Sequence, residues 1–574
     1  MLILGLNHGI DAGAALVEDG RVLAAVNEER LNRQKMFWGP PLLSLEEVLR
    51  VADVDPAEIE HVAQASLTGG GGVHEDFLSP PPIKRAVERL SQLPLSHSHL
   101  VKGAYRAASG RRRQDPVVDA RLRELGVRAP KRYVEHHHCH AAGAYYCSPF
   151  GERPEDVLVV TVDGVGDGIC HSINEVSKEH RILRRHESMI FDSIAEIYAY
   201  VTHNLGFRYN RHEGKITGLA AYGRPERTIE VFRGVMGWDR DRLELRSRLA
   251  WGRPGARRLH ALLRSYARED VAAGLQRAVE EVMTGLVGAA LERYQKRLLC
   301  LAGGLFSNVR VNQCLMELPA VEDVYVHPGM GDCGQGLGAA LGRWAQLEPS
   351  PKPRPLRNVY LGPSFGADEI ERALGAQGVA YHRSPDVHAE TAELLARKLV
   401  VARFAGRMEY GPRALGHRTI YFHAGDRAVN QWLNERLERT EFMPFAPILL
   451  EDRAGELFEG WHPERSVAAR FMTITYRATP QGQAQAPAAI HVDGTARPQT
   501  VTAEDNPDAH AILAAYERLT GLPVLINTSF NMHEEPIVCT PHDAVRAFLQ
   551  GRLDALAIGD FVALHPERSA SRRP

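Results

Sequence analysis

The first thirty residues alternate short apolar runs with polar turns. The apolar run LILGL precedes the turn NHGIDAG, and AALVE, a DG turn and RVLAAVNEE follow. Two runs joined by a DG turn are typical of a β hairpin. The same order of strand, acidic glycine-rich turn and hairpin returns from residue 157, in VLVVTV, DGVGDG and GICHSINEVSKEHRILRR. We interpret the recurrence as an internal duplication whose two lobes face each other across a nucleotide cleft, with chance similarity as the alternative.

Two stretches carry a helical pattern. Residues 75–133 are rich in Arg, Leu and Ser at helical spacing and predict an inserted helical region. Residues 225–295 also predict helices, because VAAGLQRAVEEVMTGLVGAALERY places apolar residues three and four positions apart. This pattern favours a helix that faces the core over a binding surface.

A proline-rich stretch divides the chain. Closely spaced prolines in QLEPSPKPRPLR, at 346–357, cannot continue a helix and favour extended backbone. We therefore predict two α/β domains, one over 1–349 and one over 356–568. In the second domain we expect strands in KLVVARFAG, SVAARFMTITYR and LPVLINTSF, and an exposed loop in ATPQGQAQAPAA.

Composition narrows the class of protein. The 574 residues carry a formal charge of −2 and a pI of about 7.0, so no overall field attracts nucleic acid. Hydrophobic residues make up 44% and charged residues 24%, which excludes global disorder. We expect a cytoplasmic protein with reduced thiols, because the N-terminus lacks signal-peptide features, no apolar window is long enough to span a bilayer, and the seven cysteines show no C-x-x-C spacing.

The segment VEHHHCHAAGAYY holds four histidines within five residues. His136 and His140 share one face of a helix, because they lie four residues apart. Two imidazoles at that spacing converge on one ion, so the pair predicts a metal site. The alternative is a patch of surface histidines. His137 and His138 point elsewhere.

Two imidazoles alone make a weak site for a divalent metal, so we expect carboxylate ligands from other segments. Asp163 follows the strand VLVVTV, and Asp332 lies in HPGMGDCGQGLGAAL. Small residues beside each one expose backbone amides that suit a phosphate or a metal. An acidic residue next to glycine is also an ordinary turn signal.

Further segments predict anion and nucleotide contacts. In CLAGGLFSNVRVN, Gly303 and Gly304 permit close approach of a nucleotide, while the chain lacks a P-loop. In the second domain, MEYGPRALGHRT carries Arg413 and Arg418, whose guanidinium groups suit phosphate unless they form internal ion pairs. Arg497 and the polar run after LPVLI, which includes Asn527 and Ser529, add to a second anion-binding site.

Together these motifs resemble the carbamoyltransferase family that includes the nodulation and antibiotic O-carbamoyltransferases. The resemblance extends from the N-terminus to about residue 565. It rests on DAGAALVEDGRVLAAVNEER, HHHCHAA, VDGVGD, EGKITGLAAYG, LAGGLFSNV, HPGMGDCGQGLGAAL, EYGPRALGHR, HVDGTARPQTV, NTSFN and EEPIV.

The resemblance implies an actin-like (ASKHA) duplicated first domain, similar to the tRNA threonylcarbamoylation protein, and a YrdC-like second domain. It further implies that the second domain makes carbamoyl-adenylate from carbamoyl phosphate and ATP, and that the first domain transfers the carbamoyl group to a hydroxyl. The residues implied for the first domain are the metal ligands His136, His140, Asp163 and Asp332, with Fe2+ expected, and the nucleotide contacts Gly164, Glu213, Lys215, Gly303, Gly304 and Asn308. Those implied for carbamoyl phosphate and ATP in the second are Arg413, Arg418, Arg497, Asn527 and Ser529.

The chain departs from the family in two places. The family commonly has His-Asp-Ala-Ser where this chain has Ile10, Asp11, Ala12 and Gly13. We assign catalysis to Asp11 and to His8, since an imidazole can take the acceptor proton at neutral pH. Family members also often carry an arginine at the position of Met443 and a lysine near Leu437, and Arg436 or Arg439 could compensate.

The sequence therefore predicts an ATP- and metal-dependent O-carbamoyltransferase for a small-molecule hydroxyl in antibiotic or other secondary metabolism. A tRNA-binding modification component is the alternative, supported by RAASGRRRQ at 106–114, which we instead interpret as a solvated loop. A zinc hydrolase is disfavoured, because no Glu follows His136 as in H-E-x-x-H.

Overall fold

The computed structural model describes residues 1–67, 115–436, 445–465 and 467–567. The chain forms two compact units. The first contains Met1–Leu23 and Met36–Leu356, and the second contains Ala24–Lys35 and the chain from Arg357 onward. Among the described residues no helix is long and apolar enough to cross a membrane.

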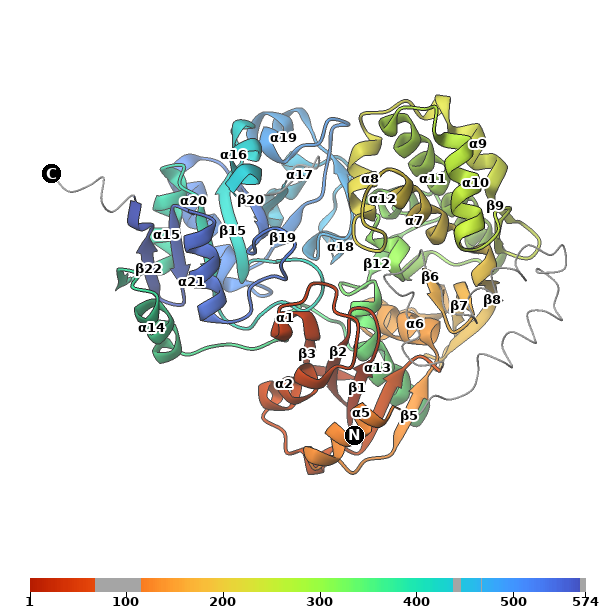
Figure 1. The fold of residues 1–574 in the computed structure, drawn as a ribbon, viewed down its shortest axis with the longest axis horizontal. Helices are drawn as coiled ribbons and strands as arrows, with labels where there is room; N and C mark the ends of the chain where they lie inside the picture. Colours follow the sequence, from red (N-terminus) through yellow and green to blue (C-terminus); the bar gives the residue numbers. More distant parts are fainter. Residues whose placement is uncertain (68–114, 437–444, 466, 568–574) are drawn as a thin grey trace. The chain divides into compact units, whose positions relative to one another are not determined.

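The first unit holds two five-stranded sheets with the same strand order (Figure 1). The first sheet has the order β3-β2-β1-β4-β5, with bounds β1 Leu2–Asn7, β2 Gly13–Glu18, β3 Arg21–Asn27, β4 His61–Ala65 and β5 Lys131–Val134. Residues 24–27, at the end of β3, belong to the second unit. The second has the order β8-β7-β6-β11-β12, with bounds β6 Val157–Gly166, β7 Ile169–Val176, β8 Ile182–Met189, β11 Leu298–Ala302 and β12 Asp323–Val326.

Strand directions repeat as well. The central strand of each sheet, β1 or β6, pairs antiparallel with the next strand along the chain. On its other side it pairs parallel with β4 or β11, which in turn pairs parallel with β5 or β12. The duplication predicted from the two strand–turn–hairpin segments is thus confirmed, and the repeated order is that of the actin-like fold.

A pair of helices lies between the two sheets. Helix α6 (His136–Tyr146) packs on β6, β7 and β11, while α13 (Gln335–Leu347) packs on β1, β2, β4 and β5. The two helices also pack on each other (Figure 1). They approach closely because Gly338 has no side chain: a Cβ there would lie 2.1 Å from the main-chain oxygen of Cys139.

Helices cover the outer side of the second sheet with a large apolar core. They are α7 (Ile194–Asn204), α8 (Glu213–Ala220), α9 (Ile229–Val235), α10 (Arg253–Leu263), α11 (Arg268–Tyr294) and α12 (Val309–Met316). The 225–295 region is not all helical as predicted, since it contains the hairpin β9 (Met236–Asp239) and β10 (Glu244–Ser247). Helix α2 (Leu42–Ala52) and α5 (Pro116–Glu124) belong to the first lobe, and the rest of the predicted helical insertion before residue 115 lies outside the described residues.

The second unit is built on one mixed sheet with the order β13-β22-β21-β14-β15-β20-β16-β19. Its strands are β13 Tyr381–Arg383, β14 Val401–Phe404, β15 Arg418–His423, β16 Ala446–Leu450, β19 Gln499–Val501, β20 Val524–Ser529, β21 Ala555–Ile558 and β22 Phe561–Leu564. A separate pair joins β17 (Tyr476–Arg477) and β18 (Thr495–Ala496). The mixed α/β class predicted for this part of the chain is confirmed.

Helices complete the second unit. They are α1 (Glu28–Asn32), α14 (Ala367–Ala376), α15 (Val387–Ala396), α16 (Ala428–Arg436), α17 (Ala454–Leu457), α18 (Val467–Arg470), α19 (Pro480–Gln485), α20 (Pro507–Thr520) and α21 (Pro541–Gln550). Helices α15 and α20 pack together over the sheet, where their apolar residues form its core.

Two local predictions for the second unit are wrong. The segment SVAARFMTITYR is not one strand, because it begins with α18 and reaches a strand only at Tyr476. The segment ATPQGQAQAPAA is not an exposed loop, because it forms α19, whose N-cap Thr479 accepts a hydrogen bond from the Gly482 amide. Gly482 is buried, and a Cβ there would lie 2.3 Å from the Leu457 main-chain oxygen.

Candidate functional site

The repeated strand order brings the predicted residues of the first unit to strand ends. In the first lobe His8 follows β1, and Glu135 and His136 follow β5. In the second lobe Asp163 lies near the carboxyl end of β6, and Gly303 follows β11. Loops at the carboxyl ends of parallel strands meet at one edge of a sheet, which is where α/β folds bind ligands.

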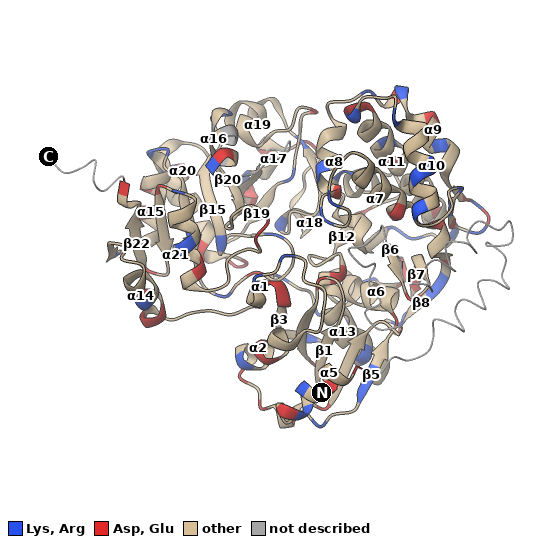
Figure 2. Ribbon diagram, viewed as in Figure 1, with Lys and Arg blue, Asp and Glu red and all other residues tan. Residues whose placement is uncertain are grey.

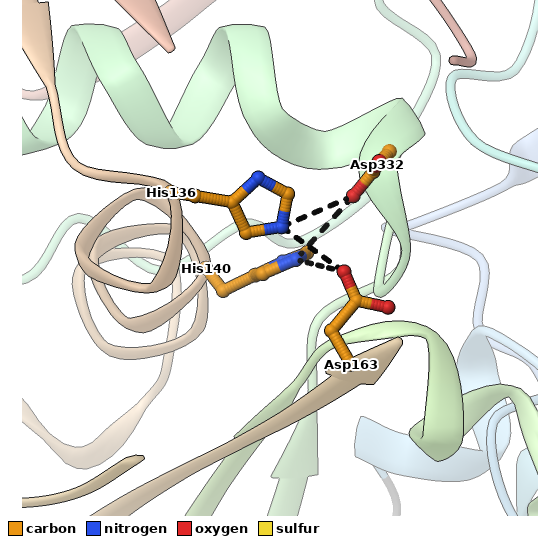
Figure 3. Close-up of side chains that lie close together, drawn as sticks. All are labelled: His136, His140, Asp163 and Asp332. Carbon is orange, nitrogen blue, oxygen red and sulfur yellow. Dashed lines mark hydrogen bonds and ion pairs between the residues drawn. The ribbon is translucent and has the colours of Figure 1, made fainter. Parts of the chain in front are cut away.

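Four side chains converge at this place, from α6, β6 and the loop before α13 (Figure 3). Asp163 Oδ2 lies 3.0 Å from His136 Nε2 and 3.3 Å from His140 Nε2. Asp332 Oδ1 lies 3.4 and 3.6 Å from the same two nitrogens. The structure therefore brings together all four residues that the sequence predicts as metal ligands.

The four groups form a strongly coupled electrostatic cluster. Burial lowers the pKa of His136, but the carboxylates of Asp332 and Asp163 outweigh it and raise that pKa to about 10. Burial raises the pKa of Asp163, yet its bonds with His136 and His140 hold it well below its ordinary value. The Asp163 carboxylate thus stays ionised, which is the state in which it can bind a metal ion.

The donor set fits a divalent transition metal. Two imidazole nitrogens and two carboxylate oxygens suit iron, manganese or zinc. Ligands about 2.1 Å from a metal lie roughly 3 Å apart, as the nearest of these atoms do. Asp332 Oδ1 is also buried without a hydrogen-bond donor among the described residues. A buried carboxylate oxygen in this state is costly unless a cation completes it.

Neighbouring groups hold the histidine helix in place. Glu135 caps α6 by accepting a hydrogen bond from the His138 amide (2.7 Å), and Asp167 accepts one from the His136 amide (2.8 Å). Gly166 permits the His136 ring to lie close, since a Cβ there would be 2.1 Å from its Cδ2 atom. His137 points away, because its Nδ1 contacts the Thr161 hydroxyl and its Nε2 contacts the Ile169 oxygen.

Glycines predicted as nucleotide contacts surround Asp163. The amides of Gly164 and Gly304 donate to Asp163 Oδ1 at 2.8 and 3.2 Å. Gly303 has a φ of 109°, and a Cβ there would lie 2.1 Å from the Val162 oxygen, so only glycine fits. Gly303 therefore packs closely on the backbone of β6, whereas Gly304 is exposed beside Asp163.

The other predicted nucleotide residues lie on α8 and α12. Asn308 caps α12 through the Val311 amide, and its side-chain amide pairs with that of Gln276. Glu213 begins α8 and accepts a hydrogen bond from the Asn210 amide (2.8 Å), and Lys215 follows it in the same helix. Burial raises the pKa of Glu213 to about 7.

The two residues assigned to catalysis lie in the turn after β1. Asp11 has a φ of 51°. Asn7 Nδ2 ties this turn to the metal cluster by donating to the main-chain oxygens of Asp332 (3.0 Å), Ile10 (2.9 Å) and Asp11 (3.3 Å). His8 contacts the carboxylate of Asp115 through Nδ1.

In the second unit, three of the five predicted anion ligands come to one edge of the sheet. Thr419 at the start of β15 pairs with Ser529 at the end of β20, and Arg413 lies in the turn before β15. Asn527 of β20 pairs with Ala446 at the start of β16, whose parallel neighbour β19 follows Arg497. Arg413, Arg497 and Ser529 are all half-buried.

The other two, Arg418 and Asn527, are buried and bonded within the protein. The Arg418 guanidinium donates to the main-chain oxygens of Ala405, Gly406, Pro363 and His417 and lies 3.7 Å above the Phe404 ring. Asn527 Nδ2 donates to the Ala414 oxygen (3.1 Å) and to Gln499 Oε1. Both side chains shape the loop that carries Arg413.

The sequence missed several residues that build the site. Asp167 is the second aspartate of VDGVGDG, and it also accepts hydrogen bonds from the Ser66 hydroxyl and the Leu67 amide. Glu135 precedes the histidines as a helix cap, which capping rules do not find because they look for Ser, Thr, Asp or Asn. Asp115 carries no local signal beyond the Pro116 that follows it.

Some predictions lie outside the described residues, namely the basic stretch 106–114, Met443, Leu437 and Arg439. Where the chain is described, basic and acidic residues are mixed along α9 and α11, whereas α10 carries arginines without acidic residues (Figure 2). The ion pairs of Arg233 with Glu230 and Glu281 are an example of this mixture.

Comparison with known proteins gives matches along the whole chain. Residues 2–341 match the family described as carbamoyltransferase N-terminus, and residues 392–565 match carbamoyltransferase C-terminus. An uncharacterised protein of Synechocystis is 32% identical, over 100% of this chain and 98% of its own. The nodulation protein NolNO of Sinorhizobium fredii is 31% identical, over 100% of this chain and 83% of its own.

Solved structures are more distant. Component A of the (R)-2-hydroxyglutaryl-CoA dehydratase of Acidaminococcus fermentans has a TM-score of 0.32 at 14% identity, covering 60% of this chain and 98% of its own. The ROK hexokinase of Thermus thermophilus has a TM-score of 0.29 at 15% identity, covering 61% of this chain and 100% of its own. The duplicated fold of the first unit therefore rests on its own strand order.

Proposed function

Because the chain belongs to the carbamoyltransferase family and is a carbamoyltransferase, we propose that it carbamoylates a hydroxyl of a small molecule, such as a secondary metabolite, at the expense of ATP. The observation that carries the proposal is the convergence of His136, His140, Asp163 and Asp332 beside the exposed Gly304. Such a place suits an activated donor that carries phosphate.

Carbamoyl-adenylate is the proposed donor. Carbamate is a poor acyl donor until its oxygen is joined to a phosphate, which makes AMP the leaving group. The second unit would form this donor from carbamoyl phosphate and ATP. Arg413 and Arg497 would bind the phosphates, because guanidinium groups contact phosphate oxygens in pairs, and Ser529 would donate a further hydrogen bond. Arg418 and Asn527 would act by holding the loop of Arg413.

The metal cluster would serve the transfer step. His136, His140, Asp163 and Asp332 would hold the ion, for which we propose Fe2+ on the family resemblance. A bound metal would supply Lewis acidity and a template for the donor phosphate. Gly164, Glu213 and Lys215 would border the nucleotide, and Asn308 would position α12 beside it.

The test separates the two steps. Pyrophosphate release from ATP should depend on carbamoyl phosphate, and a mass-resolved screen of alcohols should find a product heavier by one carbamoyl group. Release of pyrophosphate without carbamoyl phosphate would contradict the adenylate.

His136→Ala should abolish transfer and metal content, because it removes one of four ligands. It should leave pyrophosphate release largely intact. Arg413→Ala should abolish pyrophosphate release and leave the metal content unchanged. Loss of both steps in His136→Ala would show that the two sites are not separable.

A further inference from the structure

The family histidine after β1 is replaced by Ile10 in this chain, yet a histidine stands two residues earlier. The structure shows that this histidine, His8, has a specific partner. Its Nδ1 contacts Oδ2 of Asp115, which lies 107 residues away in sequence at the start of α5. The His8 side chain is 26% exposed, whereas that of Asp115 is only 9% exposed.

Asp115 uses its two oxygens differently. Oδ1 accepts a hydrogen bond from the Val118 amide (3.2 Å) and so caps α5. Oδ2 accepts one from Nε2 of the buried Gln64 (3.1 Å) and contacts His8. A helix cap needs only one oxygen. The second oxygen, Oδ2, is not needed for the cap, so it can orient the imidazole while Gln64 holds it in place.

The bonding pattern sets the tautomer of His8. Burial raises the pKa of Asp115, but the bonds from His8, Val118 and Gln64 outweigh it and lower that pKa below its ordinary value. An ionised carboxylate only accepts hydrogen bonds, so His8 carries its proton on Nδ1. In the neutral imidazole this arrangement leaves the lone pair on Nε2, the nitrogen that can take a proton from another molecule.

The residue before His8 contacts the metal cluster. This residue, Asn7, donates from Nδ2 to the main-chain oxygen of Asp332 (3.0 Å). Gln64 lies on β4 directly beside Leu6 of β1. The end of β1, just before His8, is thus bonded to Asp332 through Asn7 and paired with Gln64, which holds Asp115.

We propose that Asp115, fixed by Gln64 and by the cap of α5, is the positioning residue that makes His8 the base for the acceptor hydroxyl in this chain. The inference rests on the proposed function. His8 Nε2 takes the hydroxyl proton as the oxygen forms a bond to the carbamoyl carbon. The bond from that carbon to the phosphate oxygen of the adenylate breaks, AMP leaves with its electron pair, and the proton passes from His8 to water.

The competing explanation is purely structural: Asp115 caps α5, and its contact with His8 adds only stability. A double-mutant cycle separates the two, because residues that act as one unit show non-additive effects on rate. The variants are His8→Ala, Asp115→Asn and the double variant. Asparagine fits poorly in either orientation, since its NH2 group would face either the Val118 amide or Gln64 and His8.

The assay supplies carbamoyl phosphate and ATP to the full chain, with glycerol as the probe alcohol. AMP release counts transfer to glycerol and to water, and pyrophosphate release measures donor formation separately. His8→Ala should lower AMP release roughly 10²–10⁴-fold. Asp115→Asn should lower it at least about tenfold. The double variant should be no slower than His8→Ala, and added imidazole should restore part of the rate to His8→Ala.

Asp55→Asn is the matched control, because Asp55 caps a short helical turn by accepting a hydrogen bond from the Ala57 amide (2.9 Å), as Asp115 does for α5. It should leave AMP release unchanged. The proposed roles of Asp115 and His8 would be overturned if the losses in the double variant were additive. They would also be overturned if His8→Ala released AMP at the wild-type rate. Absence of pyrophosphate release in the wild-type protein would instead contradict the proposed function.

Discussion

At the scale of single residues, Glu213 makes stability depend on pH. Burial raises its pKa from 4.5 to about 7, so the folded state binds a proton that the unfolded state has lost between these values. The contribution is fully present below pH 4.5 and is lost as pH rises through 7, by about 3 kcal/mol. Glu213→Gln should therefore be more stable than the wild-type protein at pH 8 and about equal at pH 4.5, as measured by urea unfolding.

Glu292 provides the control, because it is an exposed residue paired with Arg240 on the surface. Glu292→Gln should leave the pH dependence unchanged. A wild-type protein whose unfolding free energy is flat between pH 4.5 and 8 would contradict the raised pKa of Glu213.

Single residues also show what the sequence could predict about the site. The four proposed metal ligands could be found because the i, i+4 spacing of His136 and His140 is local and each aspartate lies in a glycine-rich turn. Asp115 could not be found, because its partner His8 is 107 residues away and only tertiary structure brings them together. The buried state of Arg418 could not be predicted either, since its donors bind four carbonyls from three separate segments of the chain.

At the scale of elements, the close packing of α6 on α13 positions the histidines. Gly338→Ala would place a Cβ 2.1 Å from the Cys139 oxygen and push the two helices apart. Overpacking of this kind costs about 1–3 kcal/mol. We expect a lower unfolding free energy together with a lower bound metal content, measured by urea unfolding and elemental analysis.

Gly288→Ala in α11 is the matched control, because nothing lies within 4 Å of its added Cβ. It should stabilise the helix by up to about 1 kcal/mol and leave metal content unchanged. Equal metal content in both variants would show that helix spacing does not position His136 and His140.

Elements differ in how well the sequence predicts them. The strands of the duplicated lobes follow directly from alternating runs and DG or glycine-rich turns. Helix α19 was missed because its Ala, Gln, Gly and Pro composition is typical of a loop, whereas its helix depends on the Thr479 cap and on packing against Leu457. Such tertiary contacts override local composition.

At the scale of the whole molecule, a short segment near the N-terminus is part of the second unit. Ala24–Lys35 belongs to that unit, although the prolines near residue 350 suggest a single break. Arg30 donates to the Gly411 oxygen (2.7 Å), within EYGPRALGHR. Arg33 donates to the oxygens of Pro536 and Ile537 (2.7 Å each). No local pattern in 24–35 predicts this, because the partners are about 380 to 500 residues away.

Because residues 24–35 belong to the second unit, we expect the stability of that unit to depend on them. A fragment of residues 357–574 would leave the oxygens of Gly411, Pro536 and Ile537 without their arginine donors, and each unmet buried group costs about 1–3 kcal/mol. Joining residues 24–35 to the fragment by a flexible linker should raise its urea midpoint. The same fusion with Arg30→Ala and Arg33→Ala should lose most of that gain, because its backbone remains while the donors are absent. Equal midpoints for the fragment and the intact fusion would mean that the second unit does not depend on residues 24–35 for its stability.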